Sequence, residues 1–382
     1  MNITKRRLAV AGLLSIALLA TACSSDDSGS TSDTTSGGTG ATETTSGADT
    51  TAGETTEAPS NLEATLNASG ATFPKTFYEE AIAAFTEANS GVTINYAGGG
   101  SGKGRQDLAD QIVDWAGTDG TIKDEDLPGF KGGDVLYFPT VVAPITVSYN
   151  LDGVEGLQLS ADTIAKIFQS EIKNWNDPAI AAENEGVELP DQAITVVHRS
   201  DSSGTTGNFT KFLEKAAGPD ATGVWKLGTD STVEWPADTQ AAEGNGGVAS
   251  LISSTAGSIG YVDLSDAIDA GLAYAKIKNK AGNFVEATLE DASAAAEGAE
   301  VKDNLTFSAI WAEGDNAYPI TAQTWIIVYK TQTDAAKGEA TKAFIKFILT
   351  EGQTIASEVN YAPLPKDLAD KAIAQLDSLE IG

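Results

Sequence analysis

The chain of 382 residues contains only one cysteine, Cys23, and only one histidine, His198. A single cysteine rules out a disulfide bond within the chain, and these two residues are too few for a structural zinc site. Acids outnumber bases by 54 to 24, which gives a formal net charge of -30 at pH 7. Because proteins bind nucleic acids by neutralising phosphates with Lys and Arg, this balance argues against such a partner. We therefore expect neither a metal site nor nucleic-acid binding.

The N-terminal apolar run is too short to anchor the protein as a transmembrane helix. Residues 8–20 follow Lys5-Arg6-Arg7 and lead to Cys23, whereas a spanning helix needs about 20 apolar residues. The pattern predicts a signal peptide over residues 1–22. Cys23 follows small residues, as in a lipoprotein signal whose thiol is lipidated. The alternative is an ordinary secretory peptide with an incidental cysteine.

Residues 24–60 contain no aromatic residue, no Lys and no Arg, and consist almost wholly of Ser, Thr, Gly, Ala and acids. Such a segment buries too little apolar surface to offset the entropy of folding. We expect residues 23–60 to form a lipidated, disordered tether with a span of roughly 30–35 Å. This predicts a protein held at the outer face of the cell membrane.

About 320 residues remain, more than one hydrophobic core usually serves, so we expect two lobes. The pattern begins as strand, helix, strand, helix, strand, with strands at 64–67, 93–96 and 112–116. This alternation indicates an α/β sheet with ligand loops at the carboxyl ends of its strands. Further helices are predicted at 75–87, 161–168 and 335–349.

Two apolar, extended segments are interpreted as crossings between the lobes. The first covers residues 134–150, and the return covers residues 318–329, of which 324–329 are predicted as a strand. The first lobe would then comprise residues 61–140 and 322–382, and the second would comprise residues 141–321.

The most informative segment follows the apolar run 193–197 and reads His198-Arg199-Ser200-Asp201-Ser202-Ser203-Gly204-Thr205. Here a strand is followed by an arginine, by an acid that can hold it, and by small hydroxyl residues ahead of a helix predicted at 209–217. Free N–H groups at a helix start and a planar guanidinium both suit a tetrahedral oxyanion. The segment indicates an anion-binding site.

Two earlier helix starts carry similar residues. Ser69-Gly70-Ala71-Thr72-Phe73-Pro74 precedes the helix at 75–87, and Gly98-Gly99-Gly100-Ser101-Gly102 precedes a helix predicted from about residue 104. The second segment is not a nucleotide-binding P-loop, which would need Gly at position 97 and Ser or Thr at position 104. Asp119, after the third strand, would be read from its position alone as a cap or turn residue.

These motifs occur in the same order and spacing as in a known family. Together with Trp115-Ala116-Gly117-Thr118-Asp119, Gly257-Ser258-Ile259-Gly260-Tyr261 and Ala317-Tyr318-Pro319-Ile320-Thr321, they resemble the extracytoplasmic phosphate-binding proteins of phosphate ABC importers, the PstS type. The resemblance covers nearly everything from residue 62 onward. It implies an α/β, two-lobed periplasmic-binding-protein-like fold of type II, with the ligand in the interlobe cleft.

The resemblance also implies the function and its partners. The ligand would be inorganic phosphate, with no cofactor, no metal and no catalysis. The partners would be the membrane permease subunits of a phosphate ABC importer and its ATPase, and the protein would be a monomer.

The resemblance assigns phosphate contacts from both lobes. They are Thr72, Phe73 through its N–H, Ser101 and Asp119 from the first, and Arg199, Ser203, Gly204 through its N–H, and Thr205 from the second. The matching aspartate accepts a hydrogen bond from a protonated ligand oxygen, so Asp119 would favour hydrogen phosphate and disfavour sulfate. Asp201 is expected to orient Arg199. His198 is given no role, and Lys103 stands where a small residue is expected.

Two other functions are alternatives to phosphate binding. A secreted phosphatase or esterase could use Ser203 or Thr205 as nucleophile, but the sequence offers no convincing base or metal set. An adhesion or scaffold protein could reuse the same fold, since fold alone does not define function. Trp225, Trp235, Trp311 and Trp325 are interpreted as packing residues.

Overall fold

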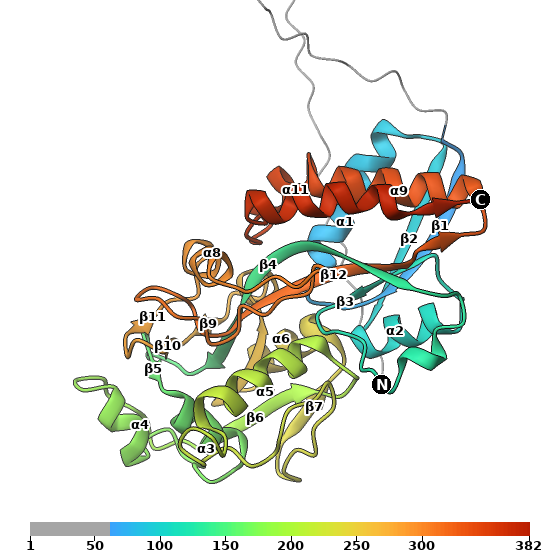
Figure 1. The fold of residues 1–382 in the computed structure, drawn as a ribbon. Coiled ribbons are helices and arrows are strands. Elements are labelled where there is room, and N and C mark those ends of the chain that lie inside the picture. Colours follow the sequence, from blue (N-terminus) through green and yellow to red (C-terminus); the bar gives the residue numbers. More distant parts are fainter. Residues whose placement is uncertain (1–61) are drawn as a thin grey trace, which may run out of the picture. The chain divides into compact units, whose positions relative to one another are not determined.

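The computed structural model describes residues 62–382, whose centre is one nine-stranded mixed sheet (Figure 1). The predicted signal peptide and tether lie outside these residues. The strand order is β2-β1-β3-β12-β4-β8-β6-β7, with β9 paired to β4. The strands are β1 (Ala64–Gly70), β2 (Val92–Gly99), β3 (Trp115–Thr118), β4 (Val135–Asn150), β6 (Thr195–Arg199), β7 (Gln240–Ala242), β8 (Ser258–Asp263), β9 (Ala273–Tyr274) and β12 (Thr321–Tyr329).

The first half of the sheet consists of β1, β2 and β3, which run parallel, and of β12, which is antiparallel to β3. Helix α1 packs against this half of the sheet through one apolar stripe. The stripe consists of residues buried at helical spacing, namely Phe77, Tyr78, Ala81 and Phe85. The helices of this half are α1 (Lys75–Ala88), α2 (Ser101–Ala109), α9 (Ala335–Leu349), α10 (Gly352–Glu358) and α11 (Lys366–Gln375).

The second half of the sheet consists of β6, β7 and β8, which are parallel to one another. Its helices are α3 (Ala161–Phe168), α4 (Pro178–Glu183), α5 (Gly204–Ala217), α6 (Gly244–Ser254) and α7 (Leu264–Asp269). Short elements complete the chain: β5 (Gln158–Leu159), β10 (Lys276–Lys278), β11 (Phe284–Val285), α8 (Leu289–Glu297), β13 (Thr331–Gln332) and β14 (Glu380–Ile381).

Strand β4 joins the two halves because it pairs with a different neighbour along each part of its length. It is antiparallel to β12 from Val135 to Pro144, and antiparallel to β8 from Ile145 to Asn150. The ladder with β12 shifts register opposite Pro139, as expected where a proline cannot donate a backbone hydrogen bond. The two halves are therefore parts of one continuous sheet.

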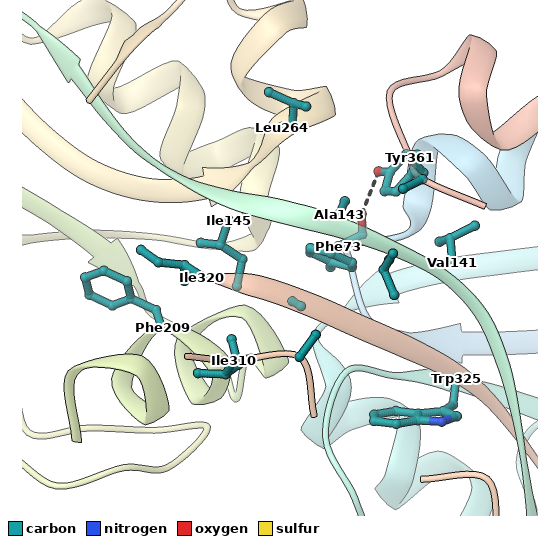
Figure 2. Close-up of a cluster of buried hydrophobic side chains, with 14 of the residues drawn as sticks. Phe73, Val141, Ala143, Ile145, Phe209, Leu264, Ile310, Ile320, Trp325 and Tyr361 are labelled. Atoms are coloured by element: carbon teal, nitrogen blue, oxygen red, sulfur yellow. Dashed lines mark hydrogen bonds between the residues drawn. The ribbon is translucent and has the colours of Figure 1, made fainter. Parts of the chain in front are cut away.

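The hydrophobic core extends along β4, where the chain passes from one half of the sheet to the other. Figure 2 shows Val141, Ala143 and Ile145 along β4, with Phe209 of α5 and Trp325 of β12 nearby. All five are buried, at 1% exposure or less. Buried side chains form one cluster that reaches from β1 to the C-terminal segment. A smaller cluster lies between α6, α7 and the strands β6 and β8.

The predicted helices at 75–87, 161–168 and 335–349 are confirmed, and so is the strand at 324–329, which begins earlier, at Thr321. The strand predicted at 112–116 is wrong in its first half, since β3 begins at Trp115 and Ile112 is 66% exposed. The helix predicted at 209–217 begins at Gly204.

The helix predicted from residue 104 begins three residues earlier, at Ser101. Gly104 lies inside it, where a Cβ would come within 2.6 Å of the Cα of Gly70. The sequence pattern treats glycine as a helix breaker. Here glycine instead lets the helix pack closely on the sheet, which explains the error.

Candidate anion-binding site

The carboxyl ends of parallel strands from both halves of the sheet bring the predicted residues together. Strand β1 leads to Thr72 and Phe73, β2 leads to Ser101, and β3 leads to Asp119. In the second half, β6 ends at Arg199 and α5 begins at Gly204. Ligand sites in α/β folds form at this edge of the sheet, outside the carboxyl ends of the strands.

Asp119 is an almost fully buried carboxylate, with 1% exposure. Ser101 Oγ donates to its Oδ2 at 3.1 Å, Thr324 Oγ1 donates to its Oδ1 at 2.7 Å, and the Asp119 N–H donates back to Ser101 Oγ at 3.1 Å. Burial raises the pKa of Asp119 to about 6, although both hydroxyls and the charges of Arg199 and Arg105 act in the opposite direction. The group is therefore largely ionised at neutral pH and can accept a further hydrogen bond.

The guanidinium of Arg199 is fixed on two sides. Its Nε and Nη2 donate to the two carboxylate oxygens of Asp201 at 2.7 and 2.5 Å, and its Nη1 donates to Asn245 Oδ1 at 2.9 Å. Burial acts to raise the pKa of Asp201, but the hydrogen bonds and charge of Arg199 outweigh it, so that pKa lies below its usual value. One N–H on each terminal nitrogen of Arg199 has no acceptor among residues 62–382, so a planar pair of donors stays available to an anion.

Asn245 is a site residue that the sequence analysis missed. It is fully buried at the start of α6, directly after β7. Besides accepting from Arg199, its side chain donates to Thr205 Oγ1 at 3.1 Å, and its N–H donates to Thr72 Oγ1 at 3.2 Å. It thus links both halves of the sheet. The sequence signal was a fourth glycine-flanked helix start, at residues 243–247.

The start of α5 offers unused donors. Ser203 caps this helix, since its Oγ accepts the Thr206 N–H at 3.1 Å. The N–H groups of Gly204 and Thr205 have no acceptor among residues 62–382. A helix N-terminus with free N–H groups attracts negative charge.

Phe73 belongs to the site through its backbone. Its ring is buried, and its carbonyl accepts a hydrogen bond from Tyr361 Oη at 2.6 Å (Figure 2). The Phe73 N–H has no acceptor within the described part of the chain. Tyr361 comes from the C-terminal segment, so a residue far along the chain holds this loop in place.

The two halves of the sheet touch at the site. A Cβ on Gly204 would lie 2.5 Å from Asp119 Oδ2 and would also meet Ser101 Oγ. A Cβ on Gly100, whose φ is +91°, would lie 2.5 Å from the carbonyl oxygen of Ser202. Only glycine permits this approach at either position.

Lys103 and His198 do not join the site. Lys103 Nζ pairs with Asp107 at 2.7 Å. The ring of His198 is held between the Arg199 carbonyl at 2.9 Å and Thr239 Oγ1 at 3.0 Å, and stacks on Trp235 with centroids 5.0 Å apart. Burial lowers the pKa of His198. Both nitrogens of the ring are therefore engaged away from Ser203.

Residues 62–382 contain no group of three or more His, Cys, Asp or Glu side chains that could hold a metal ion. Within the same residues, no helix has the length and apolar character needed to cross a membrane.

A family model for the PBP superfamily domain matches residues 34–351 of this chain. The chain is 38% identical to the phosphate-binding protein PstS of Pasteurella multocida over 320 residues, covering 81% of this chain and 89% of the relative. It is 36% identical to PstS of Methanocaldococcus jannaschii, covering 81% and 86%. The chain belongs to the PstS family of phosphate-binding proteins.

Solved structures support the same fold. A high-affinity periplasmic phosphate-binding protein, PfluDING, solved with bound phosphate, aligns with a TM-score of 0.68 at 23% identity and covers 84% of this chain and 96% of its own. The phosphate-binding protein of Stenotrophomonas maltophilia gives 0.64 at 23% identity, covering 82% and 94%. The predicted α/β, two-lobed periplasmic-binding-protein-like fold is confirmed.

Proposed function

We propose that this protein binds inorganic phosphate, as hydrogen phosphate, outside the cell membrane and delivers it to the permease of a phosphate ABC importer with its ATPase. Its lobes would be residues 61–140 with 322–382, and residues 141–321. The ligand contacts would be the eight residues that the sequence analysis assigned, with Asn245 added.

One observation carries this proposal: a fixed guanidinium and a buried carboxylate meet at the same site. Arg199 supplies a permanent positive charge with two free N–H donors. Asp119 supplies an acceptor that repels any anion lacking a proton. Hydrogen phosphate satisfies both groups because it carries two negative charges and one O–H, whereas sulfate at neutral pH has no proton to donate.

Calorimetric titration of the purified protein with phosphate, arsenate and sulfate at neutral pH tests the function. We expect micromolar or tighter phosphate binding, equivalent to about -8 kcal/mol or beyond, binding of arsenate, which keeps the proton, and rejection of sulfate. Equal binding of phosphate and sulfate would contradict the proposal.

Gly204→Ala should weaken phosphate binding by about 1–3 kcal/mol, roughly 5- to 150-fold, because the added methyl group overpacks the contact with Ser101 and Asp119. Gly207→Ala in the same helix is the matched control, since its Cβ would lie no nearer than 3.7 Å to any atom outside its own helix. Calorimetry on both variants, with circular dichroism to verify folding, measures the effect. Equal affinities would mean that Gly204 does not approach the first lobe in the bound state.

The phosphatase or esterase alternative finds little support in the site. Ser203 Oγ accepts the Thr206 N–H as a helix cap, and Thr205 Oγ1 accepts from Asn245. The ring nitrogens of His198 are bonded to Arg199 and Thr239, so neither serves as a base for these hydroxyls. We infer that the protein is not an enzyme.

We further propose that a lipid on Cys23 attaches the protein, as a monomer, to the outer face of the cell membrane. Cys23→Ala should release the protein from the membrane fraction, because the predicted signal peptide is too short to serve as a spanning anchor. Cell fractionation followed by immunoblotting measures this. A variant that stays in the membrane fraction would oppose the lipid anchor.

A further inference from the structure

A cavity of about 220 Å³ adjoins the candidate site. Both halves of the sheet line it, and two of its lining residues, Asp119 and Gly204, belong to the site itself. Its other lining residues have no part in the contacts assigned to bound phosphate. The charges of these residues can therefore act on an anion before it reaches the site.

Five charged side chains line this cavity, which we call the outer cavity: Arg105, Asp119, Lys123, Lys211 and Asp230. Lys123 and Asp230 neutralise each other through an ion pair of 2.8 Å. Since Asp119 is the only other carboxylate, two cations face one buried acid. The cavity is locally positive in a chain whose formal net charge is -30.

Arg105 is held in place without being neutralised. Its Nη1 donates to Thr118 Oγ1 at 3.0 Å, and no carboxylate among residues 62–382 forms an ion pair with it. Burial lowers its pKa, with nearby carboxylates acting in the opposite direction, but an arginine stays charged at neutral pH. Arg105 and Arg199 are the only arginines after residue 23. Both act on Asp119.

Lys211 lies on α5, two turns beyond the helix start at Gly204. It forms no ion pair or hydrogen bond with any residue from 62 to 382. Burial lowers its pKa, and the like charges of Lys215 and Lys302 add to this. A partly buried ammonium beside other lysines is stabilised by any anion that approaches it.

We propose that the outer cavity is a second, weaker anion position where Arg105 and Lys211 hold a hydrated phosphate before it enters the site. This inference rests on the proposed function. Surface charges are screened beyond about 8–10 Å in physiological salt, so the many distant acids count less there than the two adjacent cations. A positive cleft with low-dielectric walls raises the local concentration of anions and the association rate.

Stopped-flow tryptophan fluorescence of the full protein with inorganic phosphate tests this at low and high salt. We expect Lys211→Gln to lower the association rate constant about 3- to 10-fold at low salt, with a dissociation rate unchanged within twofold. The difference should disappear near 0.5 M salt because screening then removes the steering. Lys371→Gln is the matched control, since it removes the same charge from α11 and should leave both rates unchanged.

An association rate equal to that of the wild type at low salt would overturn the inference, and so would an effect confined to the dissociation rate, which would place Lys211 in the site itself. A wild-type protein that does not bind phosphate in the calorimetric titration would instead overturn the proposed function. The two failures are therefore distinguishable.

Discussion

Arg199→Ala should weaken phosphate binding by about 3–5 kcal/mol, a factor of roughly 150 to several thousand, in a protein that still folds. The buried anion would keep its desolvation cost and lose the guanidinium that offers it a pair of free N–H donors. The phosphate affinity of Arg199→Lys should lie between those of the wild type and Arg199→Ala, since lysine keeps the charge but lacks the planar pair of donors. Calorimetry measures all three affinities.

This variant needs a test of folding, because Arg199→Ala also leaves Asp201 without its partner. Urea denaturation separates a loss of stability from a loss of affinity. Lys173→Ala is a suitable control, since it breaks an ion pair with Asp238 that is exposed on both sides, and such pairs contribute little. A folded Arg199→Ala variant whose affinity changes by less than twofold would refute the assignment.

Asp119→Asn should relax the discrimination against sulfate. An amide can donate a hydrogen bond as well as accept one, so the variant no longer demands a proton on the ligand. A site built to form a hydrogen bond with its ligand rejects an analogue that lacks this hydrogen bond by a factor of about 10⁴ or more. We expect the affinity for sulfate to rise about 10- to 100-fold in the variant. Titration of both proteins with phosphate, arsenate and sulfate gives the ratios. Unchanged rejection of sulfate would rule out this mechanism.

The same substitution should change the pH dependence of stability without ligand. The pKa of Asp119 is about 6 in the folded protein and about 3.9 in an unfolded chain. Protonation therefore stabilises the fold fully below about pH 4, and this contribution, about 3 kcal/mol, is lost as the pH rises through 6.

Asparagine does not titrate, so the free energy of unfolding of Asp119→Asn relative to wild type should rise by about 2.5 kcal/mol, most of that contribution, between pH 4 and pH 7.5. Burial also raises the pKa values of Asp263 and Asp266, but both proteins contain these acids, so their contributions largely cancel. Urea denaturation at several pH values measures the difference. A constant difference would mean that Asp119 titrates normally.

Local patterns in the sequence predicted most of the elements that build the site. The helix starts near Thr72, Ser101 and Ser203 carry their signal in adjacent glycine, proline and hydroxyl residues, and the structure brings all three to one edge of the sheet. The assignment of Asp119 as ligand acceptor needed the family resemblance, because its position alone indicated a cap or turn.

Asn245 and Arg105 could not be found in this way. Asn245 matters because it bonds to Thr72, Arg199 and Thr205, which are separated from it by up to 173 positions. Arg105 has no motif around it, and its importance arises from a cavity that both halves of the sheet enclose. Both roles depend on how distant segments pack, which spacing along the chain does not encode.

The path of the chain through the sheet also determines the order in which the protein can fold. The hydrogen bond from Thr324 to Asp119 closes a loop of 205 positions, and contacts of such separation slow folding. Strand β3 pairs with β1 on one side and with β12 on the other, so it lacks the second neighbour until β12 has been synthesised. The strands β6, β7, β8 and β9 all lie within that loop of the sequence. The first half therefore cannot be finished until nearly all of the chain is available, although the strands of the second half are complete by Tyr274, so we expect the first half to form last and to limit the folding rate.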